Sequence, residues 1–272
     1  MSALSAGNLA VITGGASGIG LAAAKAFAGL GLRVVIVDRP GPALDEAAAA
    51  IEGAIAMATD VADRAAMTTL ADTIAERHGA VSVLMNNAGV GAGGDVLADP
   101  AAWEQVLGVN LMGVVHGVQS FVPAMIAHGQ PGLVVNTGSK QGITQPPGNT
   151  AYNVSKAGVK ALTEGLAHTL RQETGDRITA HLLIPGYTFT GMTARGATEQ
   201  PAGAWSADQV VAFMLDGIAA GNFYLLCPDN ETTPEQDRKR MLWAAGDLVE
   251  NRPALSRWHP AWRERFDRYM AD

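Results

Sequence analysis

Cysteine, aromatic residues and basic charge are all scarce in this chain of 272 residues. One cysteine, Cys227, cannot form an internal disulfide bond or a cysteine-based metal site. Lys and Arg number 19 against 26 acidic residues, which gives a formal net charge of −7 at pH 7. Because the phosphate backbone of a nucleic acid repels an acidic surface, we expect no nucleic acid partner.

Membrane spans, leader sequences and metal ligands are further features that we do not find. No stretch of about 18 uncharged apolar residues flanked by charge stands out, so we expect no membrane contact. Residues 1–7 lack the basic segment followed by an apolar one that begins a secretory signal, which predicts a cytoplasmic protein. Because His116, His128 and His181 have no partner at ligand spacing, we expect no metal site.

Short apolar runs alternate with Ala-rich helical segments through the first 190 residues. Runs of this length are typical of buried parallel strands; they span 9–13, 33–37, 54–58, 81–85, 132–136 and 179–184. The segments with helical spacing are 20–30, 42–52, 65–78, 100–127 and 151–174. This alternation predicts an α/β fold with a doubly wound parallel sheet, a Rossmann-like single domain.

The pattern changes after residue 190. A loop over 190–206 precedes a predicted helix at 207–221 with Ser206 as its N-cap, and a last strand at 222–227. We place one main domain at 1–228, within which the segment at about 187–206 forms a loop. Residues 229–272 form a C-terminal extension with a helix at 238–247 and three tryptophans. An exposed tryptophan cluster is costly, so we expect the extension to pack on the domain or on a neighbouring subunit.

A glycine-rich turn joins the first strand to the first helix. Gly14, Gly18 and Gly20 let the backbone turn sharply and a pyrophosphate approach closely, with Ser17 and Ile19 at the helix N-terminus. Free N–H groups there attract phosphates. The alternative is a tight turn without a ligand.

Acidic residues follow the second and third strands. Asp38 can accept both hydroxyls of an adenosine ribose and repel a 2′-phosphate, which favours NAD. Arg39 leaves NADP open, because its guanidinium can pair with a 2′-phosphate. Asp60, followed by Val61, can accept from an adenine amino group or simply begin a turn.

Tyr152 and Lys156 lie four residues apart in a predicted helix, on one face. A free tyrosine has a pKa of about 10, too high for a base at neutral pH. A nearby cation lowers that pKa. We therefore expect Lys156 to lower the pKa of Tyr152.

Six motifs in order resemble the short-chain dehydrogenase/reductase family over about residues 8–190. They are the turn at 13–20, Asn86-Asn87-Ala88-Gly89, Asn110, Ser139, Tyr152 with Lys156, and Pro185-Gly186 followed by Thr190. Gly138 and Thr188 depart from the family's usual residues.

The resemblance implies a catalytic set of Asn110, Ser139, Tyr152 and Lys156. Ser139 would hold the substrate oxygen, Tyr152 would be the general acid/base, and Lys156 would tune it and bind ribose. Asn110 would hold a water that links Lys156 to solvent. The implied cofactor residues are Gly14, Ser17, Gly18, Ile19, Gly20, Asp38, Arg39, Asp60, Val61, Asn87, Ala88, Gly89, Tyr152, Lys156, Pro185, Gly186, Thr188 and Thr190.

The substrate would meet residues that follow the strand ends. The resemblance implies that the main domain at 1–228 binds the dinucleotide and carries the catalytic set, with a substrate loop at about 187–206. We expect a mostly apolar wall of Gln141, Ile143, Tyr187, Phe189 and Met192, with Trp205 and Phe223 also within reach. Lys140 is the one cation that we can name near this pocket. The wall favours a hydrophobic or aromatic alcohol or ketone.

The function predicted is NAD(H)-dependent interconversion of a secondary alcohol and a ketone. The alternatives are an NADP(H)-dependent ketoreductase of the same family, a sugar-nucleotide epimerase or dehydratase on the same scaffold, and a non-catalytic dinucleotide sensor. Relatives usually form tetramers through segments equivalent to 103–125 and 151–174, which implies a homo-oligomer, a tetramer or a dimer.

Overall fold

The computed structural model describes residues 2–91, 93–194 and 196–272. Its strands are β1 (Leu9–Thr13), β2 (Arg33–Asp38), β3 (Ile55–Ala58), β4 (Val81–Asn86), β5 (Gly132–Thr137), β6 (Ile178–Ile184) and β7 (Tyr224–Leu226). Its helices are α1 (Gly18–Gly29), α2 (Pro42–Ala49), α3 (Arg64–His78), α4 (Pro100–Leu107), α5 (Gly113–Ala127), α6 (Gln141–Thr144), α7 (Thr150–Thr174), α8 (Gly191–Ala194), α9 (Ala207–Ala219), α10 (Pro234–Val249) and α11 (Arg263–Ala271). The predicted strands and long helices agree with these bounds to within a few residues.

All seven strands form one parallel sheet in the order β3-β2-β1-β4-β5-β6-β7. The predicted doubly wound α/β fold is confirmed. The order reverses between β1 and β4, and in such sheets a crevice opens outside the carboxyl ends of the strands at that point. The fold therefore places the glycine turn after β1 and the segment after β4 on either side of one crevice.

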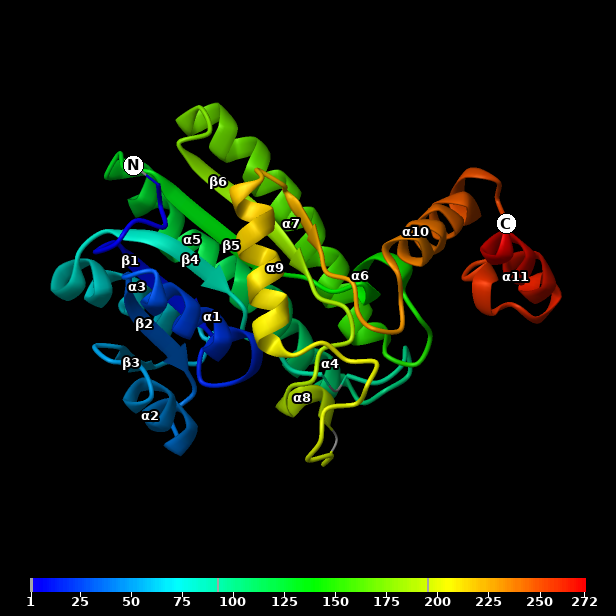
Figure 1. The fold of residues 1–272 in the computed structure, drawn as a ribbon, viewed down its shortest axis with the longest axis horizontal. Helices are drawn as coiled ribbons and strands as arrows, with labels where there is room; N and C mark the ends of the chain where they lie inside the picture. The colour runs from blue at the N-terminus through cyan, green and yellow to red at the C-terminus, as the bar shows by residue number, and fades with distance from the viewer. Residues whose placement is uncertain (1, 92, 195) are drawn as a thin grey trace.

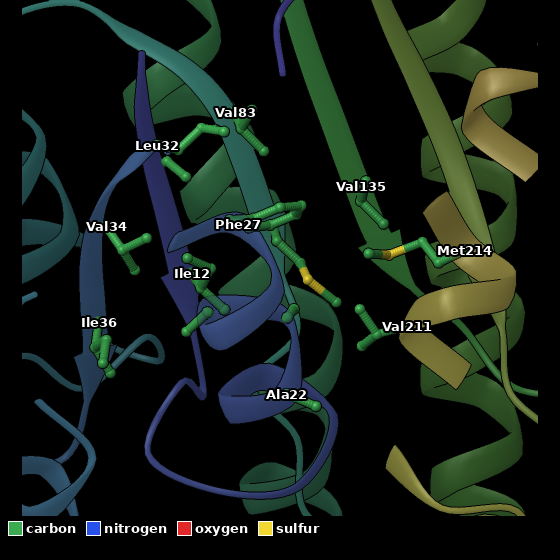
Figure 2. Close-up of a cluster of buried hydrophobic side chains, with 14 of the residues drawn as sticks. Ile12, Ala22, Phe27, Leu32, Val34, Ile36, Val83, Val135, Val211 and Met214 are labelled. Carbon is green, nitrogen blue, oxygen red and sulfur yellow. The ribbon is translucent and has the colours of Figure 1, made fainter. Parts of the chain in front are cut away.

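Two helical layers cover the sheet (Figure 1). On one face α1, α2 and α9 bury a cluster in which Phe27 lies over Ile12 and Val83, while Val211 and Met214 of α9 extend it towards β5 (Figure 2). On the other face α3, α5 and α7 pack on the odd-numbered positions of β1 and β2, such as Val11 and Val35. Strands buried on both faces explain why they appear in the sequence as continuous apolar runs.

The helical segment Pro100–Ala127 corrects two expectations. It is long and apolar enough to cross a membrane by length and composition, so the premise that no such stretch exists is wrong. Its apolar side chains, among them Phe121, Val122 and Met125, pack on the sheet. It is also not one uniform helix, because a π-helical turn, Gly108–Met112, separates α4 from α5.

A chain of buried polar side chains ties β4, β5 and α7 together. Asn86 Nδ2 donates to Asn136 Oδ1 at 2.8 Å, and Asn136 Nδ2 donates to Thr163 Oγ1 at 3.1 Å. Buried amides retain such partners because an unpaired one is costly. Asn86, the first residue of the Asn-Asn-Ala-Gly motif, therefore has a structural role, and the lining of the cleft begins at Asn87.

The C-terminal extension folds around its own aromatic cluster. Trp243 of α10 contacts the rings of Trp262, Phe266 and Tyr269, and the Arg252 guanidinium lies 4.4 Å from its ring centroid. Thr233 caps α10 with a capping box, so the helix begins earlier than the predicted residue 238. Helix α10 of the extension packs against α6, and the extension as a whole lies apart from the sheet (Figure 1). The division of the chain at residue 228 stays a prediction.

Candidate active site

A cleft of about 540 Å³ opens at the carboxyl ends of the strands. Every predicted cofactor residue except Gly20 lines it, and so do Ser139 and Met192. The residues come from segments far apart in the chain, which the parallel sheet brings to one edge. The sequence reasoning therefore located most of this wall.

The glycine turn is shaped by contacts as well as by backbone angles. Gly14 has a φ of +64°, and a Cβ on it would lie 2.6 Å from the Cα of Ala88. A Cβ on Gly20 would overlap the Gly14 carbonyl oxygen, so Gly20 permits close packing behind the cleft and does not line it. The glycines thus let the backbone at the N-terminus of α1 pack closely at the cleft, where free N–H groups can attract a phosphate.

Asp38 is held in a fixed orientation at the cleft wall. Its Oδ2 accepts from the Ala16 N–H at 3.0 Å, and its Oδ1 accepts from the Arg39 N–H at 2.8 Å. Arg39 also lines the cleft. Asp60 lines the cleft too, and its Oδ1 accepts from the Ala62 N–H at 2.9 Å, which closes a local turn.

Asn87 joins the ends of three strands. Its side chain donates to the Gly14 carbonyl at 3.2 Å and accepts from Thr137 Oγ1 at 3.2 Å, while its N–H donates to Thr13 Oγ1 at 3.0 Å. These bonds fix the glycine turn against the segment after β4.

Tyr152 and Lys156 occupy successive turns of α7 beside the end of β5. The Lys156 ammonium donates to the Thr137 carbonyl at 2.7 Å and lies 5.8 Å from the centroid of the Tyr152 ring. Burial lowers the pKa of Lys156 to about 8.

The pKa of Tyr152 is raised, contrary to the expectation of a lowered value. Burial raises the pKa of Tyr152, and a hydrogen bond with the Ser139 side chain offsets only part of that rise. The Lys156 ammonium is engaged by the Thr137 carbonyl. Ser139 and Tyr152 do meet, as the spacing predicts.

Asn110 lies in the π-helical turn, fully buried, and is not part of the cleft lining. Its Oδ1 accepts from the Val90 N–H at 2.7 Å, and its Nδ2 donates to the Val90 carbonyl at 2.9 Å. The side chain therefore clamps the segment after Gly89. Both polar atoms of the side chain are engaged by the backbone of Val90, and the predicted role of Asn110 in holding a water stays a prediction.

Of the predicted substrate residues, Met192 alone lines the cleft. Met192 reaches over Gly91 from α8. Gln141, Tyr187 and Phe189 are outside the lining: Gln141 begins α6, Tyr187 is 37% exposed, and the Phe189 N–H pairs with the Trp205 carbonyl.

The two aromatic residues named as within reach pack elsewhere. Trp205 contacts Phe213 beside the core, and Phe223 contacts Tyr224. Ordinary core packing therefore accounts for them. Arg195, in the predicted substrate loop, lies outside the described residues.

Several lining residues were missed. Thr59 directly follows β3, and Thr137 is the last residue of β5. The expectation that polar residues at the carboxyl ends of strands line the crevice, which pointed to Asp60, could have found both. Glu104, Gln105 and Val109 reach the cleft from α4 and the π-helical turn. They carry no local signal, because their place depends on how that helix crosses the sheet edge.

Comparison with known proteins agrees with this geometry. Residues 8–201 match the family model described as short chain dehydrogenase. A galactitol 2-dehydrogenase (L-tagatose-forming) from Cereibacter sphaeroides is 39% identical over 194 residues, 70% of this chain and 74% of that protein. The chain belongs to the short-chain dehydrogenase/reductase family.

Solved structures of this family superpose closely. A short-chain dehydrogenase/reductase from Burkholderia phymatum in complex with NAD is 33% identical, with a TM-score of 0.81 over 91% of this chain and 96% of that one. A metagenomic short-chain oxidoreductase in complex with NADP is 29% identical, with a TM-score of 0.69 over 83% of this chain and 98% of that one. Both nicotinamide dinucleotides thus occur among structures similar to this short-chain dehydrogenase/reductase.

The burial of Lys156 predicts an unusual titration in the enzyme without cofactor. With ¹³Cε-labelled lysine, one side-chain resonance should titrate near pH 8, and it should be absent from Lys156→Met. The unfolded chain binds that proton up to about pH 10.5, so the free energy of unfolding of the wild type relative to Lys156→Met should rise between these two pH values. Titration of every lysine resonance above pH 10 would contradict the burial of the ammonium.

Proposed function

We propose that the protein is an NAD(H)-dependent oxidoreductase that interconverts a secondary alcohol and a ketone. The observation that carries the proposal is the convergence of Ser139, Tyr152 and Lys156 in one cleft that the glycine turn and the Pro185-Gly186 loop also line. A cleft lined by a glycine-rich turn at a helix N-terminus and by a candidate acid/base pair fits a redox dinucleotide and a small substrate.

The chain's own residues would supply binding and proton transfer. Ser139 would donate to the substrate oxygen and hold it beside the Tyr152 hydroxyl, which gives or takes the proton. Lys156 would keep a positive charge behind the Tyr152 ring, where it favours the phenolate as the proton leaves. Hydride transfer at the substrate carbon is the chemistry that a bound nicotinamide supplies.

Asp38 supports NAD as the preferred cofactor. Two backbone N–H groups hold its carboxylate at the cleft wall after β2, where an acid accepts ribose hydroxyls and repels a 2′-phosphate. Arg39 supports the NADP alternative. The preference is a question of which side chain reaches the ribose.

The predicted preference for a hydrophobic or aromatic substrate now has less support. It depended on Tyr187 and Phe189, which do not line the cleft, and of the predicted wall only Met192 does. We therefore propose only the class of secondary alcohols and ketones. The homo-oligomeric assembly and the cytoplasmic location stay predictions.

A non-catalytic dinucleotide sensor would not need the acid/base pair. Here Tyr152 is buried against Ser139, and Lys156 is held by Thr137, an arrangement that binding alone does not require. This observation favours the enzyme over the sensor.

Replacing Tyr152 by Phe removes the proton donor and leaves the ring. Turnover of the best alcohol from a panel of aromatic, alicyclic and polyol substrates should fall about 10²- to 10⁴-fold, while NADH binding, measured by fluorescence, is retained. Tyr269→Phe in the extension is the matched control and should keep the wild-type rate. Unchanged turnover in Tyr152→Phe would contradict the mechanism.

Replacing Asp38 by Asn removes the charge that repels a 2′-phosphate. Calorimetry should show that the wild type binds NAD more tightly than NADP, and that this preference falls about tenfold or more in the variant. Arg39→Gln is the companion variant and should leave NAD affinity unchanged. Tighter binding of NADP by the wild type, lost in Arg39→Gln, would assign the ribose site to Arg39.

A further inference from the structure

Lys140, the residue after Ser139, faces neither solvent nor cleft. Its ammonium lies 3.0 Å from Asp229 Oδ2 and 2.5 Å from Asp237 Oδ2. The side chain of Lys140 is 17% exposed, and those of Asp229 and Asp237 are 5% and 8% exposed. Lys140, the cation that the sequence placed near the substrate pocket, is therefore paired with two largely buried carboxylates.

The two carboxylates belong to the C-terminal extension. Asp229 follows β7, and Asp237 lies in the first turn of α10. Asp229 also accepts from the N–H groups of Thr232 and Tyr187. Although burial alone raises it, these N–H groups and Lys140 hold the pKa of Asp229 below its ordinary value. The carboxylate thus stays charged and tied to four partners, counting the Glu231 N–H.

The cluster also touches the Pro185-Gly186 loop. A Cβ on Gly186 would lie 2.6 Å from Asp229 Oδ2 and 2.9 Å from Lys140 Nζ. The Tyr187 N–H donates to the same Asp229 oxygen at 3.1 Å. One carboxylate therefore holds the residue next to Ser139 and the loop that contacts the nicotinamide in the family.

The segment that runs from Ser139 into α6, here called the Ser139 turn, is held on its other side by α7. A Cβ on Gly142 of α6 would lie 2.5 Å from the Lys156 carbonyl carbon, so α6 rests on the backbone of α7. Since α10 packs against α6, the turn lies between the catalytic helix and the extension. Its position depends on both neighbours.

We propose that Lys140, together with Asp229 and Asp237, positions the Ser139 turn relative to the Pro185-Gly186 loop, so that the C-terminal extension helps to set the rate of hydride transfer. The proposal rests on the proposed alcohol dehydrogenase function. Lys140 acts through Ser139 and touches no reacting atom. A misplacement of about 1 Å between reacting groups costs about 10²-fold in rate, so a small shift of this turn is enough to be measured.

The first test neutralises Asp237 and leaves the other two charges in place. In Asp237→Asn, kcat should fall about tenfold or more, the KM values for alcohol and NAD should change less than about threefold, and the isotope effect with a carbinol-deuterated alcohol should increase. Glu235→Gln, the same change on an exposed position of α10, should match the wild type. Equal kcat and isotope effect in Asp237→Asn and the wild type would overturn the proposal.

A second pair of variants covers the case in which Asp237→Asn folds poorly. Lys140→Arg keeps a cation that can face both carboxylates, and it should retain most of kcat, whereas Lys140→Met should lose about tenfold or more of it. Equal losses of kcat per folded enzyme in both variants would contradict a role for the charge. Folded enzyme is counted by NADH binding.

A readout without turnover separates this proposal from the proposed function. In Asp237→Asn, hydrogen–deuterium exchange should become faster in the peptide that contains the Tyr187 amide and in the peptide over 139–145, but not in the core strands. If the wild type oxidises no alcohol, the proposed function fails while faster exchange still supports the positioning cluster. Unchanged exchange in both peptides would overturn the cluster's role whatever the activity.

Discussion

The buried ammonium of Lys156 is the constraint on which the rest of the site depends. A lysine charge in the interior is costly unless it is paired or hydrogen-bonded, and here it has the Thr137 carbonyl at 2.7 Å. That bond ties α7 to the end of β5 and so fixes where Tyr152 stands. α6 rests on the Lys156 backbone, which places Ser139 opposite the Tyr152 side chain. The positions of Ser139 and Tyr152, the proposed substrate-holding and acid/base residues, thus depend on how one buried cation is hydrogen-bonded.

Close backbone approach is the second requirement, and it explains the uneven distribution of aromatic residues. Only Phe27, Trp103 and Phe121 precede residue 150. Gly14 lies against Ala88, and Gly20 lies against Gly14, so larger side chains in this half would fill the phosphate end of the cleft. The later half supplies Tyr152 and the tryptophans of the extension, which form a cluster of their own around Arg252.

The sequence predicted what depends on local pattern. Apolar runs gave the strands, and spacing gave the glycine turn, Asp38 and the pair Tyr152 and Lys156, because each of these is defined within a few residues. The carboxyl ends of parallel strands meet at one edge, so strand order alone gathers them. Residues predicted in this way form most of the lining of the cleft.

What could not be predicted depends on contacts between distant segments. Asn110 turns to the Val90 backbone because the helix around it is π-helical, which no local motif revealed. Tyr187 does not line the cleft, and its N–H donates to Asp229, more than forty positions away in the chain. Lys140 looked like a free cation, since its two acidic partners lie in the extension.

The central claim is that a hydride moves directly between the substrate carbon beside Ser139 and a bound nicotinamide. The most direct measurement uses a secondary alcohol deuterated on its carbinol carbon, with NAD, and mass spectrometry of the reduced dinucleotide. The account predicts that the deuterium appears on the nicotinamide ring and that the ketone product lacks it. Deuterium released to water, or no reduced dinucleotide from any alcohol of the panel, would contradict it.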